Sequence, residues 1–210
     1  MGAERTAEDF SRSFPGETVI WSQGSAMRRS VSGDPALVVA TPGAEPRAPS
    51  GYEAVVILDA RSQLLRPALQ VTVDAARRWF AAALLARPQG KMVIVADHAE
   101  PVVQALVRWD AAGLADRELK DRVETGLTPC SRMAVLGGRG EDIDEVLAAL
   151  TVKHWLRGRT ESRCIVAVAG SDGPELSHQL RGITSARSAN RTSGRPGQQV
   201  NVVLDPRQLA

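Results

Sequence analysis

Three short apolar runs constrain the fold of this chain more than any other feature of its sequence. They occupy residues 36–41, 54–59 and 91–97, are rich in Val, Ile and Leu, and are bounded by Gly and Pro. Such runs are typical of buried strands, and the helix-length segment before the third run favours a parallel sheet. The pattern predicts an α/β fold whose ligand crevice lies at the carboxyl ends of the strands, starting with residues 42–45.

The segments after residue 127 alternate differently and predict a second, smaller domain. A β-α-β-α-β order within about 80 residues is typical of a two-layer α+β domain. In the first part we also expect a helix at 4–14, a strand at 18–21 and helices at 67–85, from 101 and at 114–124. In the second part we expect strands at 132–137, 163–169 and 199–205, with helices at 142–150 and 174–188.

Positive charge is concentrated toward the C-terminal end. Residues 151–210 hold nine Arg or Lys against four Asp or Glu, while the whole chain has a net charge of only +2. This asymmetry points to a polyanionic partner, although an ordinary arginine-rich surface explains it as well. The candidate phosphate contacts are four arginines around a polar stretch: Arg181, Arg187, Arg191 and Arg195.

Several chemistries are excluded by absent motifs. The sequence has no glycine-rich phosphate loop with its Lys and Ser/Thr, no Gly-x-Ser-x-Gly elbow and no His with metal-ligand spacing. Cys130 and Cys164 are isolated, so neither a zinc site nor a disulfide framework is predicted. No apolar stretch reaches the roughly 18 residues that cross a bilayer, so we expect no membrane contact.

Aromatic residues are few and scattered. Trp79 and Phe80 lie on a predicted helix beside Leu84 and Leu85, and we expect them in the core rather than in a base-stacking platform. Asp59 and Asp97 lie at the ends of apolar runs. We expect each to begin the following segment rather than to bind a metal ion or a ribose hydroxyl.

A set of motifs in fixed order resembles the C-terminal part of the PriA family of primosomal replication restart proteins, in the degenerate form of GC-rich bacteria. The resemblance covers nearly the whole chain. It is carried by Glu-Arg-Thr-Ala-Glu at 4–8, Phe-Pro-Gly at 14–16, Leu-Val-Val-Ala-Thr-Pro-Gly-Ala-Glu-Pro at 37–46, Val-Arg-Trp-Asp at 107–110, Glu118 with Arg122, Gly-Leu-Thr-Pro at 126–129 and Leu-Asp-Pro at 204–206.

The resemblance implies a domain plan. Residues 1–100 would be the second RecA-like lobe of a helicase, residues 101–127 connecting helices, and residues 128–210 the family's C-terminal domain. In the family, ATP binds to a first lobe and zinc to Cys pairs, and both would precede these residues. We therefore expect no cofactor and no metal site in this chain.

The departures from the family pattern imply lost ATP chemistry. The nucleotide-contacting segment is reduced to a remnant with Thr41, Gly43 and Glu45. The arginine-finger segment falls on residues 81–88, where both finger positions are Ala or Leu and Arg87 is shifted off them. An aliphatic side chain cannot stabilise charge on a transferring phosphoryl group, so we expect no catalytic residue.

The resemblance implies a DNA-binding protein of replication restart and primosome assembly without helicase or ATPase activity. The implied partners are forked or single-stranded DNA, single-stranded-DNA-binding protein and other primosome proteins, in the cytoplasm with the nucleoid. Two alternatives stay open. One is an ATP-dependent 3′–5′ DNA helicase whose first lobe is supplied elsewhere, and the other is a docking module for single-stranded-DNA-binding protein.

Overall fold

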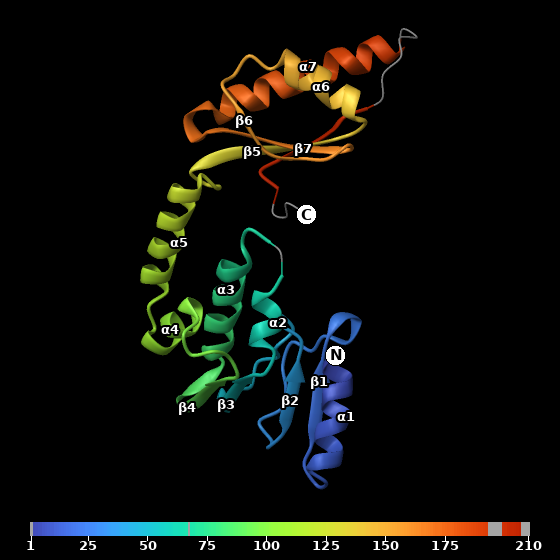
Figure 1. Ribbon diagram of the computed structural model, residues 1–210. Helices are drawn as coiled ribbons and strands as arrows, with labels where there is room; N and C mark the ends of the chain where they lie inside the picture. Colours follow the sequence, from blue (N-terminus) through green and yellow to red (C-terminus); the bar gives the residue numbers. More distant parts are fainter. Residues whose placement is uncertain (1, 67, 193–198, 207–210) are drawn as a thin grey trace. The chain divides into compact units, whose positions relative to one another are not determined.

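The computed structural model describes residues 2–66, 68–192 and 199–206, with the backbone alone at 190–192 (Figure 1). The chain divides into two compact units. Unit 1 comprises Met1–Arg66 and Val71–Leu114, and unit 2 comprises Pro67–Gln70 and Ala115–Ala210. The mixed α/β class is confirmed, because unit 1 holds small parallel sheets and unit 2 an antiparallel sheet.

The first part of unit 1 is a helix over a two-stranded parallel sheet. Strands β1 (Val19–Ser22) and β2 (Leu37–Ala40) pair from Val19 opposite Leu37 to Ser22 opposite Ala40, with the turn η1 (Gly24–Ala26) between them. Helix α1 (Ala3–Ser13) contacts both strands and buries Ala3 and Ala7, whose small side chains allow close approach. The Ala3 N–H donates to Oε1 of Gln23 at 2.9 Å, which satisfies one free amide at the helix start.

The second part of unit 1 packs three helices on another parallel pair. Strands β3 (Tyr52–Ile57) and β4 (Ala86–Ile94) lie with helices α2 (Ala60–Leu64), α3 (Val71–Ala83) and α4 (Pro101–Arg108). The core centres on Trp79, whose side chain is 1% exposed and whose Nε1 donates to Oε1 of Gln63 at 3.2 Å. The prediction that Trp79 lies in the core is confirmed.

Two expectations for unit 1 were wrong. The apolar runs were expected in one parallel sheet, but β2 pairs with β1, and β3 pairs with β4 in a separate sheet. The strands were also expected to be buried, but Val56 and Val93 are 52% and 48% exposed. The alternate residues Ile57, Met92 and Ile94 join the helix-covered core, so the described elements cover only one face of this sheet.

The helix predicted at 67–85 is shorter than expected. It begins at Val71 and is preceded by the separate short helix α2. The strand predicted from residue 91 begins at Ala86, so the Pro-Gln-Gly segment at 88–90 lies within β4. A register irregularity between Tyr52 and Ala54 accommodates this segment.

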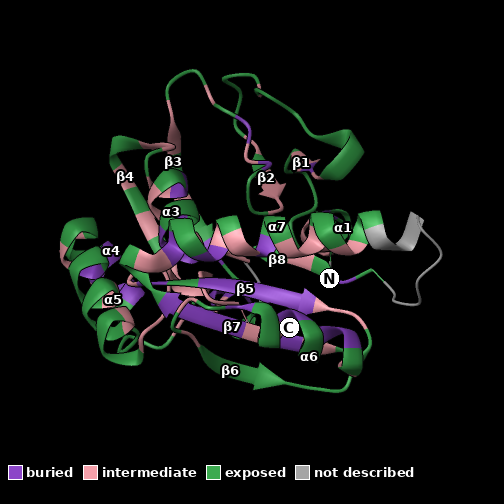
Figure 2. Ribbon diagram, turned by 90° about the horizontal axis from the view of Figure 1, so that it is seen from above, coloured by how far each residue is buried: buried purple, intermediate pink, exposed green. Residues whose placement is uncertain are grey.

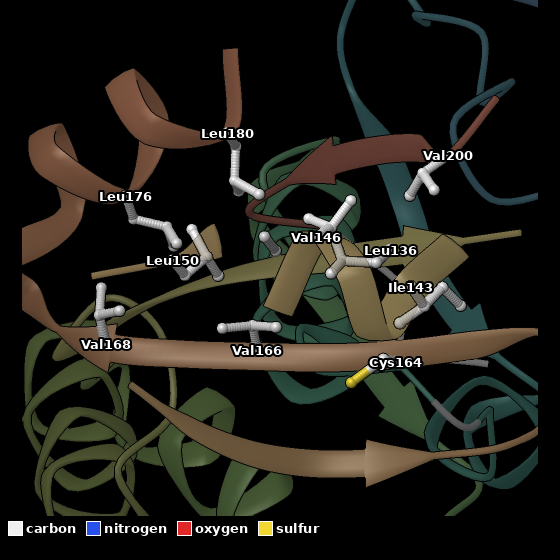
Figure 3. Close-up of a cluster of buried hydrophobic side chains, with 11 residues drawn as sticks. Leu136, Ile143, Val146, Leu150, Cys164, Val166, Val168, Leu176, Leu180 and Val200 are labelled. Atoms are coloured by element: carbon white, nitrogen blue, oxygen red, sulfur yellow. The ribbon is translucent and has the colours of Figure 1, made fainter. Parts of the chain in front are cut away.

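Unit 2 is a two-layer domain, as predicted. Its antiparallel sheet has the order β6-β7-β5-β8 and consists of β5 (Ser131–Gly137), β6 (Trp155–Arg159), β7 (Arg163–Ala169) and β8 (Asn201–Leu204). Helices α6 (Gly140–Ala149) and α7 (Gly173–Thr192, after the turn η2, Gly170–Asp172) cover one face (Figures 1 and 3). Alternate strand residues such as Leu136 and Val166 meet Val146 and Leu180 of the helices in the core.

Strand β6 was not predicted. All five of its residues are exposed, whereas the neighbouring β7 and the next strand, β5, are largely buried (Figure 2). It is an edge strand with a register irregularity at Leu156 and Gly158, which interrupts pairing.

Helix α5 (Ala111–Thr125) carries the Glu118 and Arg122 pair that contributed to the family resemblance. The Arg122 side chain is 12% exposed and forms a 3.4 Å ion pair with Glu118. Its guanidinium donates to the carbonyls of Thr128 at 2.9 Å and of Leu69 at 2.7 Å. Arg122 therefore ties the short excursion 67–70 to the end of α5 within unit 2.

Candidate functional site

The loop after β2, which holds the predicted nucleotide-binding remnant, is held by hydrogen bonds to Ser22 of strand β1. The buried Ser22 hydroxyl donates to the Ala44 carbonyl at 2.6 Å and accepts from the Arg28 N–H at 2.9 Å. The Thr41 N–H donates to the Ser22 carbonyl at 3.1 Å. The loop conformation is thus set by a buried hydroxyl of the neighbouring strand.

Glu45 occupies the backbone amide of this loop. Gly43 has a φ of +91°, a backbone conformation that residues other than glycine rarely adopt. Its N–H donates to both carboxylate oxygens of Glu45, at 2.9 and 3.0 Å. A phosphate oxygen approaching this amide would have to displace a negative group that already accepts its hydrogen bond.

Arg87 is paired with a carboxylate of strand β3. It sits near the start of β4 and forms an ion pair with Glu53 of β3, and its side chain is 43% exposed. Within the described residues, no hydrogen bond or ion pair joins Arg87 to Thr41, Gly43 or Glu45. The structure therefore brings the three loop residues together and leaves Arg87 with Glu53.

The four predicted DNA-contacting arginines have different surroundings. Arg181 and Arg187 lie on α7, the side chain of Arg191 lies outside the description, and Arg195 lies outside the described residues. Arg181 is exposed, and no acidic partner is found for it within the described part of the chain. Arg187 is 20% exposed and forms ion pairs with Asp142 and Glu145 of α6.

A buried carboxylate that sequence reasoning missed organises this helix pair. The Asp142 side chain is 3% exposed, accepts from Nε of Arg139 at 2.9 Å and pairs with Arg187 at 2.5 Å. The hydrogen bond to Asp142 raises the pKa of Arg139, so that guanidinium stays charged. In the sequence, the available signal is a pair of acidic residues, Glu141 and Asp142, at the start of a predicted helix. This signal does not indicate that Asp142 pairs with Arg187, which lies 45 residues away.

A pocket at the start of α6 has mixed charge. Arg139 and Arg159 line it together with the acidic residues Glu141, Asp144 and Glu161. Arg159 already pairs with Asp144 at 2.8 Å. This lining does not favour phosphate.

Residues 2–66, 68–192 and 199–206 show neither a metal-ligand cluster nor a membrane-spanning helix. No group of three or more His, Cys, Asp or Glu there could hold a metal ion. No helix in this part has the length and apolar character needed to cross a bilayer. Cys130 and Cys164 are free, and burial raises the pKa of the Cys164 thiol.

Comparison with known proteins confirms the resemblance drawn from the motifs. No protein-family model matches the chain. The curated relatives named probable replication restart protein PriA from Mycobacterium tuberculosis (strain CDC 1551 / Oshkosh) and Mycobacterium bovis are 37% identical over 235 residues, which cover 98% of this chain. The protein of that name from Mycobacterium leprae (strain TN) is 38% identical over 231 residues. The chain spans 34 to 35% of the length of these relatives, consistent with their C-terminal part.

Proposed function

We propose that this chain, which is related over 98% of its length to part of the PriA replication restart proteins, is a DNA-binding replication restart protein without ATPase or helicase activity. The relationship to proteins of that name is the observation that carries the proposal. The partners are forked or single-stranded DNA, single-stranded-DNA-binding protein and other primosome proteins, in the cytoplasm with the nucleoid. Unit 1 would retain the second RecA-like helicase lobe as a scaffold, followed by connecting helices and the family's C-terminal domain from residue 128.

The surroundings of the nucleotide-binding remnant support the absence of ATP chemistry. An arginine finger must place a cation against the transferring phosphoryl group in a site that excludes water. Arg87 is half-exposed and beside a carboxylate, and the Gly43 amide is already bonded to Glu45. Both groups that would meet phosphate are thus engaged with carboxylates of this chain.

The basic C-terminal region supports DNA contact. Arg181 on α7 is exposed, whereas Arg187 forms ion pairs with Asp142 and Glu145. Phosphate contacts release counterions and make binding salt-dependent. Arg181 is therefore the described residue whose substitution tests the proposal most directly.

We expect fork DNA to bind this chain with an affinity that falls as salt rises. Arg181→Gln should weaken binding and reduce the slope of log affinity against log salt by about 1, because one phosphate contact is lost. Titrations of labelled fork DNA across a salt series measure both quantities. Arg12→Gln is the matched control, since Arg12 is also exposed but pairs with Asp9 on α1.

Two outcomes would contradict this proposal. One is fork affinity that is indifferent to salt, or to changing Arg181, Arg187, Arg191 and Arg195 together in a protein shown to be folded. The other is binding to the tail peptide of single-stranded-DNA-binding protein with no shift of naked DNA, which would select the docking alternative.

A chimera tests the helicase alternative. When the chain is joined to the part of a mycobacterial relative that it does not match, we expect no DNA-stimulated ATP hydrolysis, and no change on Arg87→Gln. Phosphate-release assays with and without single-stranded DNA measure this. Turnover that Arg87→Gln lowers by about 1,000-fold, as expected for loss of an arginine finger, would replace the proposal by the helicase alternative.

A further inference from the structure

Trp109 ends helix α4 in a backbone conformation that tryptophan rarely adopts. Its φ is +56° and its ψ is +37°, the left-handed region that favours glycine at this position. Its N–H donates to the Leu106 carbonyl at 3.2 Å and so closes the helix. Non-glycine residues held in this conformation store backbone strain and are concentrated at functional sites.

The indole of Trp109 packs against one aromatic ring and is nevertheless largely exposed. The Phe80 ring of α3 packs against it with a centroid distance of 5.0 Å and an interplanar angle of 59°. The exposed fraction of Trp109 is nevertheless 55%, compared with 38% for Trp155 and 1% for Trp79. The expectation that Phe80 belongs to the core holds only in part, because it also carries this exposed ring.

Two arginines lie close in sequence to these aromatic residues. Arg108 is exposed and adjoins Trp109, and Arg77 lies one helical turn before Phe80 on α3. The carboxylate next to the indole, Asp110, accepts from the Gly113 N–H at 2.8 Å at the start of α5. Arg77 forms a 4.0 Å ion pair with Asp74, whereas no ion pair is found for the exposed Arg108 within the described residues, so Arg108 is the cation that remains available beside the rings.

We propose that Trp109 and Phe80, with Arg108 and Arg77, form a stacking platform for an unpaired base of single-stranded nucleic acid. An exposed aromatic face receives any base, and neighbouring arginines attract the adjoining phosphates. The exposed Arg108 beside the indole favours a nucleic acid over an uncharged apolar partner. The platform rests on the proposed DNA-binding function and adds to it a contact in unit 1 that no predicted site residue supplies.

The test compares oligothymidylate with an abasic oligonucleotide of the same length. Trp109→Gly removes the indole while placing the residue best suited to the backbone at this position, so the fold is retained and the thermal midpoint should not fall. We expect it to weaken oligothymidylate binding about 10-fold and to leave abasic binding unchanged. Trp109→Phe, which keeps a ring, and Val107→Ala, a 73% exposed neighbour, should both stay within about twofold of the parent.

A second measurement follows the indole itself. In a variant with Trp21 and Trp155 changed to Phe, oligothymidylate should reduce acrylamide quenching of the fluorescence of Trp109, since Trp79 is already buried. Three results would overturn the platform. Trp109→Gly could bind oligothymidylate with the affinity of the parent, or it could lose affinity equally for oligothymidylate and the abasic oligonucleotide. The third is protection of Trp109 from quenching by an acidic peptide but not by DNA. Arg181→Gln should instead weaken the binding of oligothymidylate and of the abasic oligonucleotide to the same extent. If Arg181→Gln changes neither affinity, that result counts against the C-terminal contact and not against the platform.

Discussion

Replacing Asp142 with alanine should lower the free energy of unfolding of unit 2 by about 3 kcal/mol. The carboxylate is 3% exposed and pairs with Arg139 and Arg187, and removing one partner of a buried pair leaves the opposite charge uncompensated. The estimate lies at the low end of such losses because Arg139 is 54% exposed and Arg187 keeps Glu145. Urea unfolding followed by circular dichroism, with hydrogen exchange at β5 and β7, measures the change.

Glu145→Ala is the matched control for this prediction. Glu145 pairs with the same Arg187 but is 68% exposed, so its loss should cost about 0 to 1 kcal/mol. Equal losses for the two variants would show that burial of Asp142 contributes nothing. The comparison also bears on DNA binding, because any loss seen with Arg187→Gln must be separated from the weakened contact between α6 and α7.

Replacing Trp79 with alanine should destabilise unit 1 by about 4 kcal/mol. The side chain is almost fully buried against α4, and its removal leaves a large cavity. It also leaves Oε1 of the buried Gln63 without the hydrogen bond that the indole N–H donates to it. Hydrogen exchange should show lost protection in α3 and β4, with little change in β5 and β7.

Trp79→Phe separates packing from hydrogen bonding. It keeps an aromatic ring in the core but loses the N–H together with the five-membered ring of the indole, so a smaller cost of about 1 to 2 kcal/mol is expected. A cost as large as that of Trp79→Ala would place the main contribution in the Gln63 hydrogen bond. Loss of protection in unit 2 to the same extent would contradict the assignment of Trp79 to the core of unit 1.

The local pattern of the sequence was sufficient for most of unit 2. The run at 163–169 alternates Cys164, Val166 and Val168 toward the helices, and β7 has the predicted bounds. Strand β6 escaped prediction because Gly158 and two arginines give it no apolar alternation, and its pairing comes from β7 rather than from its own residues.

Pairing between distant segments limited what could be predicted of unit 1 and of the candidate site. Apolar runs indicate strands but do not say which strand pairs with which, so the two separate sheets could not be predicted. The contact of Glu45 with Gly43 spans two residues but depends on a left-handed glycine, and the pairing of Asp142 with Arg187 spans 45. The exposed ring of Trp109 likewise follows from a backbone angle that the residue type does not favour.

The bonds of Arg122 to Leu69 and Thr128 determine how the polypeptide can be divided for experiments. Because the chain enters unit 2 at Pro67, leaves it after Gln70 and returns at Ala115, no single cut separates the units cleanly. A fragment starting at Ala115 would retain a guanidinium that is 12% exposed and deprive it of one of its two carbonyl acceptors. Expression of unit 2 alone should therefore supply residues 67–70, through a circularly permuted or linked version, rather than a simple truncation.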